Sequence, residues 1–206
     1  MLIPWVIKLG GSLWASPLLP EWLVTLAACN VIIVPGGGLF ADAVRNAQER
    51  WAFDDGVAHV MAISAMAQYG RMLQGLCGEL WVANDCDALQ HAHRLGHSVI
   101  WLPDARTLAA TSIRASWDVT SDSLAVWLAS QIRAEQLLLI KSGAIPAGRC
   151  NLTDLVADGW LDPAFPEMMV TPPGAIWLCG PGHRDRFEKG LKNPAACFTR
   201  IVTTPS

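Results

Sequence analysis

The chain contains a series of short, nearly continuous apolar runs, and these most strongly limit the folds that it could adopt. They cover residues 5–9, 31–34, 80–83, 99–102, 137–140 and 175–178. Strands without polar alternation are typical of a parallel sheet that helices cover on both faces. Helical periodicity follows over residues 21–28, from about Phe40, and over 58–76. We therefore predict an α/β fold, a three-layer αβα sandwich with a mainly parallel central sheet.

Size and composition limit the classes of protein to which the chain could belong. A chain of 206 residues suits one domain, and the hydrophobic fraction of 52% with 16% charged residues excludes a disordered chain. The net charge of −3 argues against a nucleic-acid partner, which would require a clustered basic excess. We expect a single globular domain over residues 1–206.

The high apolar fraction raises the question of a membrane segment. Residues 22–41 carry no formal charge, but Asn30, Pro35 and three glycines interrupt them, so they cannot form one spanning helix. The N-terminal MLIPWVIK has no basic region before a long apolar run, and the six cysteines form no CxxC pair. We expect reduced thiols, no membrane partner and a cytoplasmic location.

Two of the four lysines stand at the ends of apolar runs. Lys8 ends WVIK and Lys141 ends LLLIK. A buried ammonium group is costly unless an anion or a carboxylate meets it. A lysine that extends along the surface would explain either residue alone, so the glycines beside Lys8 matter to the interpretation.

Two glycine-rich segments follow the first two predicted strands. Gly10-Gly11-Ser12 comes directly after the first, and Gly36-Gly37-Gly38 after the second. Glycines let backbone N–H groups approach a phosphate closely, and a following helix adds the positive end of its dipole. Neither segment matches GxGxxG or GxxxxGK[ST], which argues against a Rossmann or P-loop protein. Two such loops at adjacent strand ends indicate an anion site.

A polar segment, SWDVTSDSLA, covers residues 116–125. Thr120 or Ser121 is predicted to cap a helix that continues through Trp127, with Asp122 in its first turn. Capping accounts for one of these polar residues but not for so many.

IKLGGS, IIVPGGG, TSDSLA and an apolar strand ending in lysine stand in that order in the chain. In this the chain resembles the amino acid kinase family, over Lys8 to about Lys141. The resemblance implies the three-layer fold, phosphoryl transfer from ATP with Mg²⁺, and a homo-oligomer. It also implies that the N-terminal part binds the acceptor and the C-terminal part the nucleotide.

The same resemblance implies roles for particular residues. Gly10, Gly11 and Ser12 would hold the transferred phosphoryl group, and Gly36, Gly37 and Gly38 the acceptor. Lys8 and Lys141 would neutralise phosphate charge, while Asp122 would hold the two lysines in place. Such positioning and charge stabilisation suffice for phosphoryl transfer. No metal-ligating side chain is expected.

A narrower similarity lies in WLP at 101–103, SWDVTSDS at 116–123 and LIKS at 139–142. These segments are similar to small kinases of methanofuran-linked pathways, which convert [5-(aminomethyl)furan-3-yl]methyl phosphate to its diphosphate. The chain departs from UMP kinases in the SGAIP that follows Lys141, and from isopentenyl phosphate kinases in Asp42. UMP kinase, another small-molecule phosphate kinase, and a non-catalytic nucleotide- or oxyanion-binding protein on the same fold remain alternatives.

An acceptor that carries an amine would need a carboxylate. Asp54, Asp55 and Asp118 stand before or at predicted helix starts, and we hypothesise that one of them binds the ammonium group. Asp55 and His59, four residues apart, would share a helix face, and Thr120 is assigned to the same acceptor site. The alternative is that the dipole alone favours carboxylates at helix starts.

Other conspicuous residues receive structural interpretations. His91, His93 and His97 are interpreted as lying on a solvated helix face rather than as metal ligands, and residues 162–166 as a rigid surface loop. Five tryptophans are assigned to the core: Trp5, Trp81, Trp101, Trp127 and Trp177. Three others lie near predicted loops, where packing is the preferred interpretation and a pocket wall the alternative: Trp14, Trp117 and Trp160.

Overall fold

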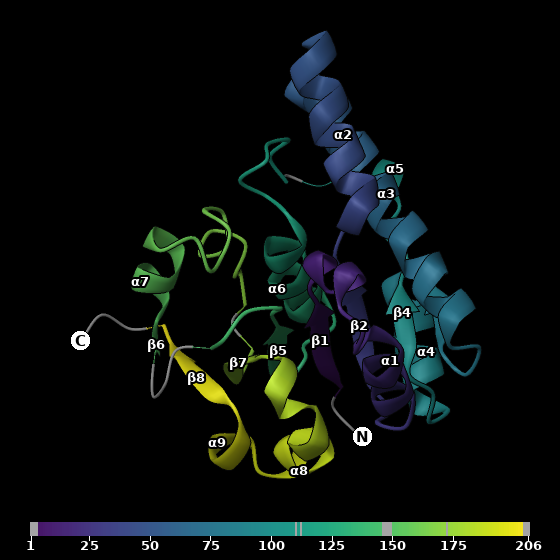
Figure 1. Ribbon diagram of the computed structural model, residues 1–206, viewed down its shortest axis with the longest axis vertical. Helices are drawn as coiled ribbons and strands as arrows, with labels where there is room; N and C mark the ends of the chain where they lie inside the picture. The colour runs from purple at the N-terminus through teal and green to yellow at the C-terminus, as the bar shows by residue number, and fades with distance from the viewer. Residues whose placement is uncertain (1–3, 110, 112, 146–149, 172, 204–206) are drawn as a thin grey trace.

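A computed structural model describes residues 4–109, 111, 113–145, 150–171 and 173–203. Its centre is an eight-stranded sheet with the order β3-β4-β2-β1-β5-β7-β8-β6 (Figure 1). The strands are β1 Trp5–Leu9, β2 Ile32–Pro35, β3 Trp81–Ala83, β4 Val99–Trp101, β5 Gln136–Ile140, β6 Cys150–Asn151, β7 Ala175–Cys179 and β8 Thr199–Val202. Of the described pairings, only that of β7 with β8 is antiparallel. The predicted three-layer sandwich with a mainly parallel sheet is confirmed, and β6 and β8 were not predicted.

The helices are α1 Leu19–Ala27, α2 Gly38–Trp51, α3 Asp55–Leu76, α4 Cys86–Arg94, α5 Ala105–Ala109, α6 Ser121–Gln131, α7 Leu152–Ala157, α8 Phe187–Lys192 and α9 Pro194–Cys197, with 3₁₀ turns η1 Gly11–Ala15 and η2 Pro181–Arg186. The four helices predicted from the sequence, now α1, α2, α3 and α6, begin within three residues of the expected positions. Helix α3 begins at Asp55 rather than at Ala58, because the Asp54 carboxylate accepts a hydrogen bond from the Val57 amide at 2.9 Å. In the described part of the chain, no helix is long and apolar enough to cross a bilayer.

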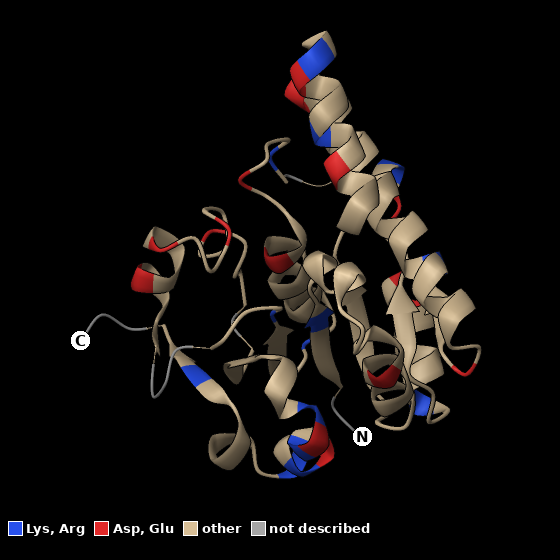
Figure 2. Ribbon diagram, viewed as in Figure 1, with Lys and Arg blue, Asp and Glu red and all other residues tan. Residues whose placement is uncertain are grey.

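The sheet separates the core into two layers, and the side chains of β1 pack into both. Ile7 and Leu9 pack in the cluster that includes Trp22 of α1 and Phe187 of α8. Val6 belongs to the other cluster, with the apolar side chains of α6. Successive side chains of a strand point to opposite faces, so Lys8 shares the α6 face with Val6. Figure 2 shows that most charged residues lie on helices and loops around the sheet, which makes a lysine within β1 exceptional.

Helices α2 and α3 pack against each other and extend beyond the sheet (Figure 1). Helix α2 starts at Gly38, within the second glycine segment, and runs away from the sheet, and α3 runs back alongside it (Figure 1). That arrangement forms one wall of the site described below.

Three interpretations from the sequence are wrong. Trp81 is 45% exposed on edge strand β3, where it stacks on His97. His93 is buried in α4 rather than solvated. Residues 162–166 do not form a mere surface loop, since Phe165 is fully buried in the core. In each case tertiary packing, which local pattern does not report, decides the environment.

The two glycine segments lie against each other at the ends of β1 and β2. The Gly36 amide donates to the Leu9 carbonyl at 2.9 Å, and the Gly10 amide to the Ile140 carbonyl at 3.1 Å. A Cβ on Gly11 would lie 2.6 Å from the amide nitrogen of Gly38, closer than such atoms approach. Gly38 also has a φ of +52°, which favours glycine. The contact between the loops therefore requires glycine on both sides.

Gly11→Ala is expected to lower the free energy of unfolding by about 1–3 kcal/mol, because the added methyl group must displace backbone. The matched control is Gly75→Ala near the end of α3, where an added Cβ meets nothing within 4 Å. That change is expected to stabilise by about 0.5–1 kcal/mol. Urea denaturation of both variants measures the difference; equal stabilities would contradict the required close approach.

Candidate active site

Asp122 binds two lysines that are far apart in the sequence. Its Oδ1 lies 2.9 Å from Lys8 Nζ, and its Oδ2 lies 2.5 Å from Lys141 Nζ. The side chains are 6%, 7% and 14% exposed for Asp122, Lys8 and Lys141. One carboxylate between two ammonium groups leaves a net positive charge in a buried place, which suits an anionic ligand.

The register of the sheet explains why the two lysines meet. Strands β1 and β5 are parallel neighbours, with Lys8 beside Leu139. Leu139 belongs to the same core cluster as Val6, on the α6 face. Because orientation alternates along a strand, Lys141, two residues after Leu139, follows on that face too. Helix α6 covers this face, and Asp122 in its first turn reaches both ammonium groups.

The charges of the cluster determine its titration. Burial alone would raise the pKa of Asp122, but the charges of Lys8 and Lys141, with their hydrogen bonds, hold that pKa below its usual value of 3.8. Burial and the nearby charge of Lys8 lower the pKa of Lys141, while Asp122 and Asp162 partly offset this. The carboxylate is therefore ionised at neutral pH.

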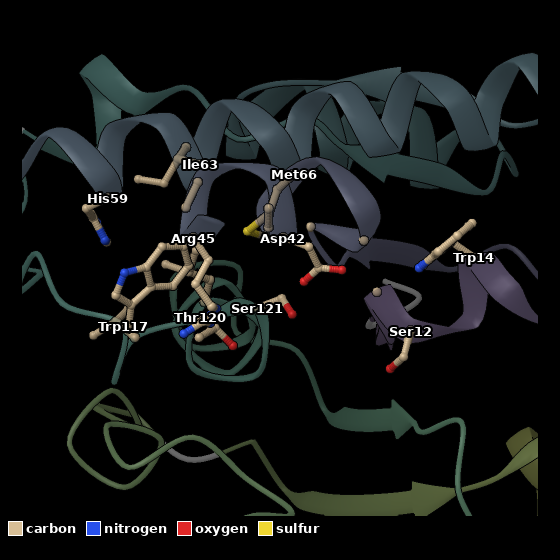
Figure 3. Close-up of a pocket in the computed structure, with 17 residues that line it drawn as sticks. Ser12, Trp14, Asp42, Arg45, His59, Ile63, Met66, Trp117, Thr120 and Ser121 are labelled. Carbon is tan, nitrogen blue, oxygen red and sulfur yellow. The ribbon is translucent and has the colours of Figure 1, made fainter. Parts of the chain in front are cut away.

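A cavity of about 250 Å³ opens beside this cluster (Figure 3). Its lining comes from four parts of the chain, namely residues 11–14, 37–45, 59–66 and 117–124. The lining residues are Gly11, Ser12, Trp14, Gly37, Gly38, Ala41, Asp42, Arg45, His59, Ala62, Ile63, Met66, Trp117, Val119, Thr120, Ser121 and Leu124. The cavity therefore lies at the carboxyl ends of parallel strands, where α/β sheets bind ligands.

One wall of the cavity is built around an indole. The Arg45 guanidinium lies 4.0 Å from the centre of the Trp117 ring, an arrangement visible in Figure 3. Trp117 Nε1 donates to Gln48 Oε1 at 2.6 Å. Gln48 Nε2 in turn donates to Asp55 Oδ1 at 2.9 Å. This chain of contacts fixes the indole and positions Arg45 at the cavity.

The structure brings together most of the residues singled out in the sequence. Gly10 lies next to Lys8, and the cavity is lined by six others, Gly11, Ser12, Gly37, Gly38, His59 and Thr120. Ser12 is also linked to the residue that follows Lys141, because Ser142 Oγ donates to Ser12 Oγ at 3.3 Å. Burial lowers the pKa of His59, so its imidazole is neutral at physiological pH.

The three carboxylates considered for an ammonium group do not line the cavity. Asp54 caps α3, Asp55 accepts from Gln48, and Asp118 pairs with Arg114 at 3.2 Å. The carboxylate of the cavity belongs instead to Asp42, which Figure 3 shows pointing into it from α2. The position of Asp42 shortly after the second glycine segment was the feature of the sequence that could have identified it. Trp14 and Trp117 line the cavity as well, whereas Trp160 packs against the core.

Thr120 occupies the N-cap position of α6, but its side chain does not cap the helix. The Asp162 side chain caps the helix instead. It accepts hydrogen bonds from the Ser123 amide at 2.9 Å and from Thr120 Oγ1 at 2.7 Å. The prediction of the helix start is correct, while the capping group comes from a distant segment.

The chain is similar in structure to known kinases. No protein-family model matches the chain. The uridylate kinase of Archaeoglobus fulgidus has a similar structure, with a TM-score of 0.73 and 17% identity over 97% of this chain and 100% of that one. The chain has the amino acid kinase fold. The UMP kinase of Bacillus anthracis is also similar, with a TM-score of 0.70 and 17% identity over 98% and 96% of the two chains.

One curated relative spans nearly the whole length. It is the [5-(aminomethyl)furan-3-yl]methyl phosphate kinase of Methanocaldococcus jannaschii, 25% identical over 211 residues, which are 96% of this chain and 97% of the relative. The resemblance to the amino acid kinase family is thereby confirmed.

Asp122→Asn is expected to lower the free energy of unfolding by about 3–5 kcal/mol at neutral pH, because two buried ammonium groups lose their counter-charge. The pKa of Asp122 lies below 3.8, so its stabilisation is present above that value and is lost as the pH falls through the folded-state pKa. The difference between wild type and variant should therefore narrow in acid. Chemical denaturation at several pH values measures it; a constant difference would contradict the ion-pair account.

Proposed function

We propose that the protein is an ATP-dependent phosphotransferase that adds a phosphoryl group to the phosphate of a small acceptor. The observation that carries this proposal is the bridge that Asp122 makes between buried Lys8 and half-buried Lys141 beside the glycine-lined cavity. Phosphoryl transfer depends mainly on positioning and on stabilising negative charge that is spread over the moving group. Two fixed cations and a row of backbone N–H groups meet that need.

The reaction conserves atoms and charge without a general base. An oxygen of the acceptor phosphate attacks the γ-phosphorus of ATP and forms a new P–O bond. The bond between the γ-phosphorus and the bridging oxygen breaks, and ADP leaves with its electron pair. Because the acceptor oxygen is already anionic, no proton has to be removed.

Different residues would bind each of the two substrates. Gly10, Gly11 and Ser12, with Lys8 and Lys141, would hold the transferred group, and Gly36 to Gly38 the acceptor. The nucleotide would bind on the C-terminal part of the domain. The homo-oligomer and the cytoplasmic location implied by the family resemblance stay predictions.

Magnesium would arrive with ATP and reduce the charge on its phosphates. Among the described residues, no group of three or more His, Cys, Asp or Glu side chains gathers to hold a metal ion. The part played by the chain's own residues in the proposed reaction is binding and orientation of the two substrates.

We propose [5-(aminomethyl)furan-3-yl]methyl phosphate as the acceptor. The name of the curated relative supports this choice, and so does the chemistry of the cavity. Asp42 suits an ammonium group, Trp117 a flat ring, and Arg45 an anion. Asp55 and His59 would act on the same acceptor, Asp55 through Gln48 and the indole.

UMP is the alternative acceptor, because the similar solved structures include UMP kinases. A uracil ring carries no cation for Asp42. A third candidate is a binding protein without catalysis, but storage of a nucleotide would not require two lysines buried around one carboxylate.

Release of ADP in the presence of ATP and Mg²⁺ separates these functions. Turnover is expected with the aminomethylfuran phosphate, with formation of its diphosphate, and little with UMP. Preference for UMP would overturn the acceptor and keep the kinase. ATP binding without turnover on any phosphorylated acceptor would contradict the kinase.

Asp42→Asn is expected to raise the acceptor KM about tenfold and leave the ATP KM unchanged, because a charge-assisted hydrogen bond to the amine is lost. Glu49→Gln on the same helix removes the same charge outside the cavity lining and serves as the control. Steady-state kinetics with both substrates measure the effect. Equal changes in both KM values would contradict a role in reading the acceptor amine.

A further inference from the structure

Asp162 makes four hydrogen bonds with the start of α6. It accepts from the Thr120 amide at 3.0 Å, from Thr120 Oγ1 at 2.7 Å, from the Ser123 amide at 2.9 Å and from Ser123 Oγ at 2.9 Å. One carboxylate thus occupies donors on both sides of Asp122, which lies between Thr120 and Ser123.

The segment that carries Asp162 is fixed in the core. Leu161 and Phe165 are buried, and the Ala164 amide donates to the Asp118 carbonyl at 3.1 Å. Asp162 therefore starts from a rigid position, and its contacts transmit that position to the first turn of α6. A carboxylate at a helix N-terminus is also stabilised by the helix dipole.

The start of α6 contributes both to the cavity wall and to the lysine cluster. Thr120 and Ser121 line the cavity, and Asp122 bridges the lysines. A small rotation of this turn would move the carboxylate away from one ammonium group. Thr120 does not prevent this by capping the helix, because its side chain accepts no capping hydrogen bond.

We propose that Asp162 is a positioning residue for phosphoryl transfer, holding the first turn of α6 so that Asp122 stays between Lys8 and Lys141. This inference rests on the proposed function for its effect on rate. Asp162 touches neither reacting group in the proposed arrangement and acts through Thr120 and Ser123. The negative charge of Asp162 also favours the charged form of Lys141.

Lysine titration tests the proposal without any turnover. The charged groups that act on Lys141 are Asp122 from α6, Lys8 from β1 and Asp162. The chain has four lysines in all, so ¹³Cε-labelled lysine gives four NMR signals that single Lys→Arg changes assign. Their titration midpoints are compared in wild type, Asp162→Asn and Asp158→Asn, the last removing an equal charge at the exposed end of α7.

In Asp162→Asn the Lys141 midpoint is expected to move to lower pH, because a favourable negative charge and the fixed position of Asp122 are both lost. Lys189 and Lys192 on α8 should not move, and Asp158→Asn should match the wild type. An unchanged Lys141 midpoint in a folded Asp162→Asn protein would overturn the proposal.

Steady-state kinetics provide a second test of the proposal. Asp162→Asn is expected to lower kcat about ten- to a hundredfold through misplacement of the cluster, with a small change in the ATP KM. Should that variant fail to fold, the pair Thr120→Val and Ser123→Ala removes two of the four bonds and keeps the charge, with a smaller loss of kcat expected. Wild-type kcat in this double variant would overturn the proposal. Absence of turnover in the wild type would overturn the proposed function instead, and the NMR result would still stand.

Discussion

Two buried ammonium groups share one carboxylate at the carboxyl ends of β1 and β5, and this interaction links the layers of the molecule. Lys8 and Lys141 come from the central sheet, while Asp122 comes from the helix that covers it. Neither lysine would be stable there without the carboxylate, because burial of an unpaired charge is costly. The arrangement leaves one positive charge in excess beside the glycine segments at the ends of β1 and β2.

Much of the fold was predictable, since its strands are nearly continuous apolar runs and its turns contain glycine. The convergence of Lys8 and Lys141 was expected only from the resemblance to the amino acid kinase family, and the parallel register of β1 and β5 now explains it. Strand β8 escaped prediction because TRIV at 199–202 mixes charge with apolar residues at the sheet's antiparallel margin. The environments of Trp81 and His93 depended on which element packs over them, and local pattern holds no information on that.

The part of the site formed by the lysines and the glycine segments was predictable, and the part formed by α2 and α3 was less so. Glycines and lysines have few uses at strand ends, so their types and positions carry the information. Carboxylates at helix starts are common, and Asp54, Asp55 and Asp118 all serve local hydrogen bonds or ion pairs. Asp42 and Asp162 matter because of distant segments that the fold brings to them. No spacing in the sequence joins Asp162 to Thr120 or Ser123.

The central claim is that the transferred phosphoryl group sits between two cations held by Asp122. A crystal structure with ADP, Mg²⁺ and a planar metal-fluoride mimic of the moving group tests it most directly. The mimic should lie against the amides of Gly11 and Ser12, with Lys8 Nζ and Lys141 Nζ both within hydrogen-bonding distance of its fluorines. A mimic bound away from either lysine, with the Asp122 contacts unchanged, would contradict the claim.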